Sequence, residues 1–283
     1  MRIIHFETGG VLGIGADEGS GWHGLTQTDS GFPGTLTELI AQGADLLRIG
    51  RSLSQSPAVD LNAVRLLPPV PIPPKILCVG LNYDDHLQES GLKKPAYPEI
   101  FARFATSLIS HQEPIRRPRE SITLDYEAEL AVVIGKPGRR ISQEQALDHV
   151  AGYSLFNDAT VRDFQLRTPQ WTMGKNFDGT GSFGPWLVTP DAVPPGASGL
   201  RIQGRLNGRV MQDSRTDRLI FSVPELIAMI SIVMSLERGD VIITGTPGGV
   251  GAARNPPVYM QAGDVFEVEI EGLGVLTNSV QDE

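Results

Sequence analysis

The most informative segment of the sequence is Leu124-Asp-Tyr-Glu-Ala-Glu-Leu-Ala-Val-Val-Ile134. Its second half is a run of five apolar residues suited to a buried strand, and Glu127 and Glu129 precede that run. Because strand side chains alternate between faces, both carboxylates should lie on one face, about 7 Å apart along the strand. A hard divalent cation bound through oxygen would compensate for their repulsion. A solvated strand face explains the same spacing, so the pattern alone leaves both interpretations open.

A third acidic residue, Asp158 in Phe156-Asn-Asp158, is a candidate to complete this group. The alternative is a turn or N-cap aspartate, because a helical turn is expected over residues 160–165. Three oxygen ligands would leave about half of an octahedral shell open for water and a bidentate substrate. Cysteine is absent from these segments and histidine is sparse, which favours Mg²⁺ or Mn²⁺ over zinc.

A possible general base lies in Gly80-Leu-Asn-Tyr-Asp-Asp-His-Leu-Gln-Glu89. His86 and Glu89 would be neighbours on a helical turn, and a carboxylate beside an imidazole fixes its tautomer and raises its basicity. Such a pair can activate water. An exposed histidine at a helix start, with an incidental acidic neighbour, is the more economical interpretation of the spacing alone. Among the other histidines, only His111 is worth testing as a base.

Composition narrows the class of protein. The chain of 283 residues has a net charge of −9, which disfavours binding to nucleic acid or to anionic lipid. It has a single cysteine, Cys78, and no apolar segment of signal-peptide or membrane-spanning type, so we expect a cytoplasmic protein. The 32 glycines and 21 prolines indicate many turns and a mainly β architecture.

Two regions are expected along the chain. A hairpin over Arg2–Phe6 and Val11–Gly15 and a capping box at Thr35-x-x-Glu38 belong to a small N-terminal domain, residues 1–70. Five prolines within residues 67–74 form a stiff connector, and residues 71–283 form the catalytic domain. Helices are expected over Ser142–His149 and from Ser222 to Met234. The expected strands are 76–80, 126–134, 186–188, 201–206, 240–244 and 265–270.

Taken together, several segments resemble the fumarylacetoacetate hydrolase family. They are Gly80-Leu-Asn-Tyr-x-x-His86-x-x-Glu89, Asp125-Tyr-Glu127-x-Glu129-Leu, Asn157-Asp158, Trp171-Thr-Met-Gly-Lys175-Asn-Phe-Asp178, Gly184-Pro-Trp, Ser222-Val-Pro-Glu-Leu-Ile and Gly239-Asp-Val-Ile-Ile-Thr-Gly-Thr246-Pro-Gly-Gly-Val-Gly251. They occur in the family's order over roughly residues 75–280. The resemblance implies an α+β, mainly β fold, a mixed β-sandwich roll with a small N-terminal α/β domain. It also implies a homodimer and a bound Mg²⁺ or Mn²⁺, with Ca²⁺ as an alternative.

The resemblance also implies roles for single residues. Glu127, Glu129 and Asp158 fall on the metal ligands, and His86 and Glu89 on the water-activating dyad. Lys175 falls on a catalytic lysine near the metal and the substrate carboxylate. The substrate-binding positions match Thr246, Gln165 and, less clearly, Arg103.

The glycine-rich segment 245–251 is not a nucleotide loop, because no helix follows it before Asn255-Pro-Pro. Its glycines, Gly245 among them, are expected to let backbone N–H groups approach a substrate carboxylate.

The activity expected from this resemblance is hydrolysis of a C–C bond in a 2,4-dioxo acid. Fumarylpyruvate and maleylpyruvate, substrates of aromatic catabolism, would give pyruvate and a carboxylic acid. The dyad favours hydrolysis because decarboxylation needs no attacking water. The same metal–enolate chemistry serves oxaloacetate decarboxylation, isomerisation of 2-hydroxymuconate-type dienes and hydrolysis of diketo-deoxy sugar acids. A metabolite-binding protein without activity is a further alternative.

Overall fold

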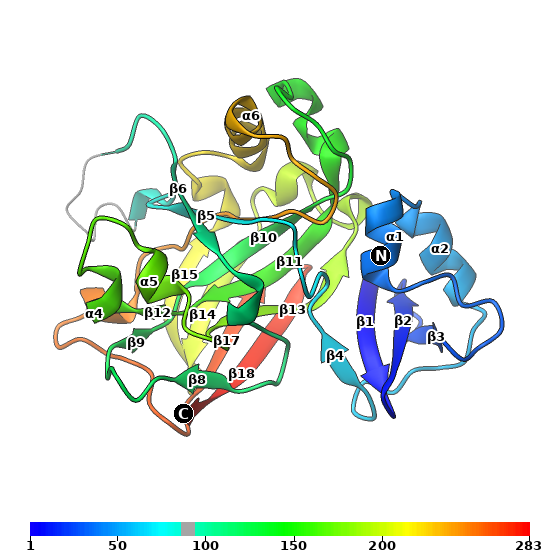
Figure 1. The fold of residues 1–283 in the computed structure, drawn as a ribbon, viewed down its shortest axis with the longest axis horizontal. Coiled ribbons are helices and arrows are strands. Elements are labelled where there is room, and N and C mark those ends of the chain that lie inside the picture. The colour runs from blue at the N-terminus through cyan, green and yellow to red at the C-terminus, as the bar shows by residue number, and fades with distance from the viewer. Residues whose placement is uncertain (86–93) are drawn as a thin grey trace.

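The computed structural model describes residues 1–85 and 94–283, and most of its strands belong to one mixed sheet (Figure 1). The strands of this main sheet are β1 (Arg2–Thr8), β2 (Val11–Asp17), β3 (His23–Thr26), β4 (Arg65–Leu67), β5 (Ile76–Gly80), β6 (Glu99–Arg103), β7 (Leu108–Ile109), β10 (Ala128–Ile134), β11 (Val150–Asp158), β13 (Gly181–Val188) and β16 (Val241–Ile243). Their order is β3-β2-β1-β13-β11-β10-β16-β5-β6, with β4 beside β1 and β7 beside β13. The expected mainly β fold is therefore confirmed.

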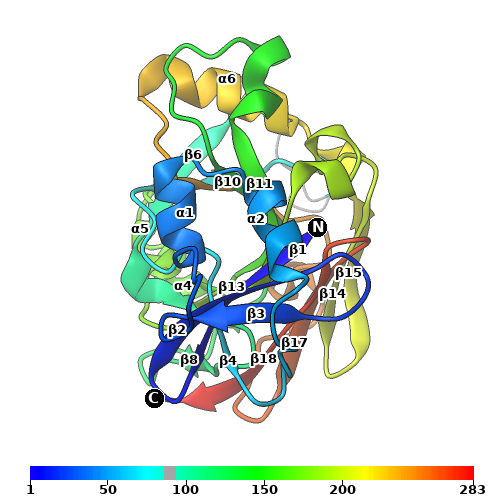
Figure 2. The same ribbon diagram turned by 90° about the vertical axis from the view of Figure 1, so that its right-hand side faces the viewer.

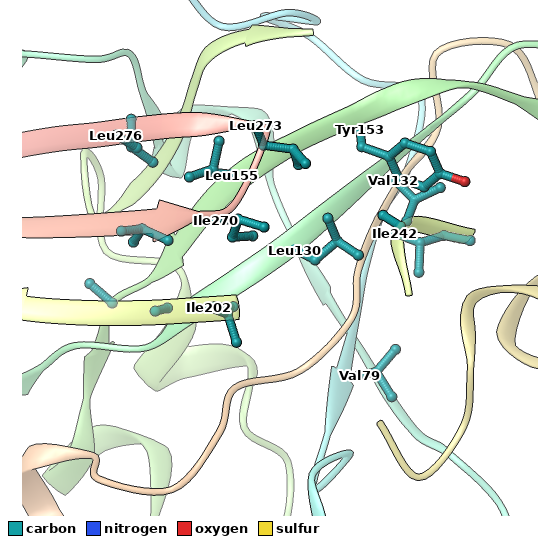
Figure 3. Packing of buried hydrophobic residues seen from close by; sticks show 14 of the residues in the cluster. Val79, Leu130, Val132, Tyr153, Leu155, Ile202, Ile242, Ile270, Leu273 and Leu276 are labelled. Carbon is teal, nitrogen blue, oxygen red and sulfur yellow. The ribbon is translucent and has the colours of Figure 1, made fainter. Parts of the chain in front are cut away.

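A second sheet covers one face of the central strands. Its strands, in spatial order, are β15 (Arg209–Arg215), β14 (Arg201–Leu206), β17 (Val265–Ile270), β18 (Gly274–Asp282) and β8 (Ile115–Arg117). Figure 3 shows Leu130 and Val132 of β10 on the same side as Ile202 and Ile270 of this sheet, and all four belong to one buried apolar cluster. Burying two apolar sheet faces against each other is the main stabilising contribution here.

The alternation along β10 sends the intervening residues to the opposite face. Ala131 and Val133 belong to a different buried cluster, together with Cys78 of β5 and Phe156 of β11. Glu129, two residues before Ala131, is on this face as well. The predicted metal ligands therefore lie on the side of the main sheet that the second sheet does not cover.

The N-terminal region continues the main sheet instead of standing apart from it. The predicted hairpin is present as β1 and β2, and β1 pairs with β13 of the catalytic region. Helices α1 (Leu36–Gln42) and α2 (Leu46–Leu53) pack beside these strands at one end of the molecule (Figures 1 and 2). The capping box at Thr35 is confirmed. Helix α2 was not expected, because its short amphipathic pattern lies where the periodicity is weak.

Other elements differ from expectation in informative ways. The residues around 142–149 form a 3₁₀ run, Gln143–His149, and not an α-helix. Helix α6 (Val223–Val233) begins with the predicted capping box at Ser222 and Glu225. The strand expected over 126–134 is shorter, since β10 begins at Ala128. The preceding β9 (Leu124–Asp125) pairs with β12 (Thr160–Val161). Within the described residues, no helix is long and apolar enough to cross a membrane.

His111 lies between β7 and β8, away from the predicted metal ligands. Its Nδ1 accepts the backbone N–H of Thr277 at 3.1 Å, and burial lowers the pKa of His111 to about 4. The imidazole is therefore neutral at physiological pH. We interpret it as a structural acceptor between two strands, and not as the base considered above.

This histidine should make the protein sensitive to acid. Its pKa in the folded state is lowered from 6.5, so the unfolded state binds the proton first as pH falls. Stability should decline from pH 6.5 toward about 4, and the loss at pH 5 should be about 2 kcal/mol. Urea unfolding measures the free energy of unfolding at each pH. This free energy should depend less on pH in His111→Asn, which keeps an acceptor for the N–H of Thr277, than in the wild type. Equal slopes would contradict the assignment.

Candidate active site

The three predicted carboxylates meet at the ends of β10 and β11. Asp158 is the last residue of β11, Glu129 is the second residue of β10, and Glu127 immediately precedes that strand. One oxygen from each lies within 4.8 Å of the others, and all three side chains are buried. The N–H of Glu127 donates to Oδ1 of Asn157 at 3.0 Å, which ties the residue before β10 to β11.

Two of these carboxylates are paired with buried cations. Lys175 Nζ donates to Oε2 of Glu127 at 2.7 Å and also to Oδ2 of Asp158. Arg162 Nη1 lies 2.7 Å from Oε1 of Glu127, and Arg103 Nη1 donates to Oδ1 of Asp158. Each cation is itself almost fully buried. Glu127 and Asp158 are thus held in place by charge-assisted hydrogen bonds on both oxygens.

Glu129 is different. Within the described part of the chain it forms no ion pair, and it accepts a hydrogen bond from the backbone N–H of Gly245. Burial raises the pKa of Glu129 well above its usual value, and the carboxylates of Asp158 and Glu127 add to the effect. A buried carboxylate of this kind must take up a proton or pair with a cation. The all-oxygen donor set and this missing charge fit a hard divalent ion bound by the three residues.

Lys175 is placed by the short helix α5 (Thr172–Lys175), which directs its side chain to the carboxylates. Burial alone would lower the pKa of Lys175, but Asp158 and Glu127 outweigh burial and raise it. The group is therefore an ammonium at the centre of the site. It lies beside the carboxylates that the resemblance assigns to a metal.

Arg103 does not line the cavity. Its fully buried guanidinium lies behind Asp158, where Nη2 donates to Thr180 Oγ1 at 2.7 Å and Nε to Ser107 Oγ at 3.2 Å. These protein contacts give it a role in positioning Asp158. The expectation that Arg103 binds substrate is corrected accordingly.

Arg162 was not predicted, although it is central to the site. It lies on the short helix α4 (Arg162–Gln165), where Nε donates to Oδ2 of Asp125 at 2.8 Å and Nη1 donates to Gln165 Oε1 at 3.0 Å. Its Nη2 has no hydrogen-bond partner in the described structure, and the residue lines the cavity. A buried, unpaired donor on a cation is a natural contact for an anionic ligand. The spacing Asp158-x-x-x-Arg162-x-x-Gln165 was the available signal.

The glycine-rich segment folds back onto acidic side chains of the same chain. The N–H groups of Gly251 and Ala252 donate to Asp125 at 2.7 and 2.9 Å, and that of Gly245 donates to Glu129. A Cβ at Gly251 would lie 1.9 Å from the Val258 carbonyl oxygen, so only glycine fits there. These N–H groups hold the carboxylates of Asp125 and Glu129. For Gly245, the expected contact was with a substrate carboxylate.

A cavity of about 180 Å³ opens beside the three carboxylates. Its polar lining includes Lys175, Arg162, Gln165 and Thr246 in addition to the ligands, and its apolar wall includes Phe101 and Trp171. The volume is below the ~300–1,000 Å³ typical of sites for drug-sized ligands, which indicates a small substrate. The predicted dyad, His86 and Glu89, lies outside the described residues.

Known proteins are similar to this chain over most of its length. Residues 75–281 match the model of the fumarylacetoacetate (FAA) hydrolase C-terminal family. The human oxaloacetate tautomerase FAHD2A, mitochondrial, is 40% identical over 288 residues, which cover 99% of this chain and 91% of that protein. Oxaloacetate tautomerase YisK of Bacillus subtilis is 40% identical over 263 residues, covering 88% and 87%.

Two solved structures extend the comparison. A fumarylacetoacetate hydrolase from Exiguobacterium antarcticum has a TM-score of 0.86 and 38% identity, with full coverage of both chains. Maleylpyruvate hydrolase from Sphingobium sp. SYK-6, in complex with manganese (II) ion and pyruvate, has a TM-score of 0.80 and 30% identity, covering 100% of this chain and 99% of that one. On this family match, these relatives and the convergent carboxylates, the chain belongs to the fumarylacetoacetate hydrolase family.

Proposed function

We propose that this enzyme interconverts the enol and keto forms of oxaloacetate in a divalent-metal-dependent reaction. The observation that carries the proposal is the placement of the Lys175 ammonium on two of three converging carboxylates, at the wall of a small cavity. An ammonium so placed can move a proton to or from a bound 2-oxo acid. The relatives named as oxaloacetate tautomerases support this activity over the hydrolysis expected from the sequence.

The divalent ion would be held by Glu127, Glu129 and Asp158, and when bound it would polarise the 2-oxo group of the substrate and lower the cost of an enolate. Mg²⁺ and Mn²⁺ are the ions we propose, since the donor set is all oxygen. The solved maleylpyruvate hydrolase contains manganese, which supports this choice.

The side chains around the cavity would bind and orient the dicarboxylate. Arg162, with its unpaired Nη2, supplies a cation for one carboxylate group, and Gln165 lies beside it. Phe101 and Trp171 form an apolar wall that limits access of water to the reacting carbon. Holding the substrate in one orientation lowers the entropic part of the barrier.

The reaction needs only proton transfers. In the direction from enol to keto, the enol oxygen gives its proton to solvent water, the C2=O bond replaces the C2=C3 bond, and C3 receives a proton from Lys175 Nζ. Lys175 then regains a proton from solvent, so the net reaction is an isomerisation without a co-reactant. In the metal-free protein, Asp158 and Glu127 raise the pKa of Lys175, so the side chain carries the proton that this step requires.

The test is a comparison of substrates with the Mn²⁺-loaded enzyme. Decay of the enol absorbance of freshly dissolved oxaloacetate should accelerate, with a rate proportional to enzyme concentration. Formation of pyruvate from oxaloacetate, fumarylpyruvate and maleylpyruvate is followed in parallel. Efficient cleavage of maleylpyruvate without acceleration of the enol decay would overturn the proposal in favour of the hydrolase.

We also propose an oligomeric state and a cellular location for the enzyme. A homodimer is inferred from the resemblance to the family. A cytoplasmic location is proposed from the single cysteine, whereas the name of the human relative places that protein in mitochondria.

A further inference from the structure

Thr246 lines the cavity, and a buried glutamine from the second sheet holds its hydroxyl. Gln212 of β15 donates through Nε2 to Thr246 Oγ1 at 2.8 Å. The Thr246 hydroxyl in turn donates to the carbonyl oxygen of Ala128 at 3.0 Å. Ala128 stands between the ligands Glu127 and Glu129. Gln212 and Thr246 are both buried, so their hydrogen bonds are shielded from water.

The orientation of the Gln212 amide is fixed by backbone groups. Its Oε1 accepts the N–H of Ala128 at 2.9 Å, and its Nε2 also donates to the carbonyl oxygen of Pro247 at 2.8 Å. Turning the amide over would place Oε1 against the carbonyl oxygen of Pro247 and the NH₂ group against the N–H of Ala128, and neither pair can form a hydrogen bond. Gln212 can therefore only donate to Thr246.

These contacts determine what Thr246 can offer to a ligand. A hydroxyl has one proton and two lone pairs. The proton is used by Ala128 and one lone pair by Gln212, which leaves one lone pair for the cavity. Donating to a ligand would require the hydroxyl to turn away and leave the Ala128 carbonyl without this partner, which is unfavourable for a buried group.

We propose that Gln212 is a positioning residue that makes Thr246 a hydrogen-bond acceptor toward the cavity, so that this wall recognises an O–H donor and disfavours a carboxylate. The donor is the hydroxyl of an enol-type substrate or a water molecule bound beside it. The inference rests on the proposed function, because it concerns the form of the 2-oxo acid that the site accepts.

The test uses two non-hydrolysable 2-oxo acids of similar shape, 3-hydroxypyruvate and 2-oxobutyrate, which differ by a hydroxyl in place of a methyl group. Their binding to the Mn²⁺-loaded protein is measured by calorimetry. If the donor is the hydroxyl of the ligand itself, we expect 3-hydroxypyruvate to bind about 3- to 10-fold more tightly than 2-oxobutyrate. Thr246→Val should abolish that preference, and Thr246→Ser, which keeps the hydroxyl, should preserve it.

Gln212→Met tests the positioning role, and loss of the preference is expected there too. Should that variant fail to fold, Gly204→Ala replaces it, because a Cβ at Gly204 would lie 2.7 Å from Gln212 Oε1 and displace the amide. Equal weakening of both ligands in Thr246→Val and in the Gln212 variant identifies a bound water as the donor.

Other results overturn the inference. The inference fails if Thr246→Val leaves the affinities for both acids unchanged. It also fails if Thr246→Val weakens the binding of both acids while the Gln212 variant binds them as tightly as the wild type or more tightly, because the Thr246 hydroxyl then donates to the ligand. It also fails when the Gln212 variant keeps the full preference of the wild type. Absence of Mn²⁺-dependent binding for either acid would remove the proposed function as well, whereas binding without the expected preferences removes this inference alone.

Discussion

Replacing Glu129 with glutamine is expected to weaken Mn²⁺ binding by at least about 100-fold and to reduce turnover by more than about 1,000-fold, with the fold retained. Glu129 is the ligand without an ion pair in the described structure, so its charge has no other partner there. Glutamine keeps the length of the side chain and an oxygen that accepts the N–H of Gly245. The neutral amide should therefore fit the metal-free protein at least as well as the carboxylate.

Calorimetric titration with Mn²⁺, together with thermal unfolding with and without the ion, measures both effects. Glu144→Gln is the matched control, because Glu144 is exposed on the 3₁₀ run and lies outside the cavity lining. The control should bind Mn²⁺ and unfold like the wild type. Unchanged Mn²⁺ affinity in Glu129→Gln would mean that the ion, and with it the proposed chemistry, is held elsewhere.

The sequence predicted that the three acidic residues form one group because their signal is local. Glu127 and Glu129 precede an apolar strand at a spacing of two, and Asp158 ends the strand that pairs with it. The antiparallel register of β10 and β11, with Ala128 opposite Asn157, brings the three together without help from distant segments. Residue type and alternation were enough to propose this group.

The residues that hold the ligands could not be predicted in the same way. Gln212 reaches Ala128 across 84 positions of sequence and Arg103 reaches Asp158 across 55, and neither pairing has a periodic pattern. Arg103 was assigned to substrate by the resemblance alone, and a basic residue near an anionic site can either bind substrate or position a carboxylate. Only burial and partners separate them, and here the guanidinium is used by Asp158, Thr180 and Ser107.

The pairing of the N-terminal strands with the main sheet could not be predicted from the sequence either. The proline-rich residues 67–74 indicated a boundary, and the family match does begin at residue 75. Yet β1 pairs with β13, and Ile3 and Leu187 share a buried cluster. A boundary in composition is therefore not a boundary in packing, because strands distant in sequence can complete one sheet.

Replacing Lys175 with methionine is expected to lower the turnover of oxaloacetate by about 10²–10⁴-fold, the range of one general acid, while Mn²⁺ still binds. The ammonium shares Glu127 and Asp158 with the ion, so its loss should maintain or increase Mn²⁺ affinity. In the metal-free protein, the same loss removes one partner from a buried charge network, which costs about 3–5 kcal/mol. We therefore expect a lower unfolding temperature without metal and a larger stabilisation by Mn²⁺ than in the wild type.

This combination separates a proton donor from a residue that merely keeps the site folded. If Lys175 only stabilised the fold, the variant would lose activity because part of it is unfolded. Saturating Mn²⁺ would restore the folded protein, and turnover would then return to the wild-type level. Lys136→Met, a change at an exposed lysine outside the cavity lining, controls for the loss of a cation. Near-normal turnover by Mn²⁺-saturated Lys175→Met would show that another group transfers the proton. The carboxylates would then remain a metal site, but the part of the mechanism assigned to Lys175 would be wrong.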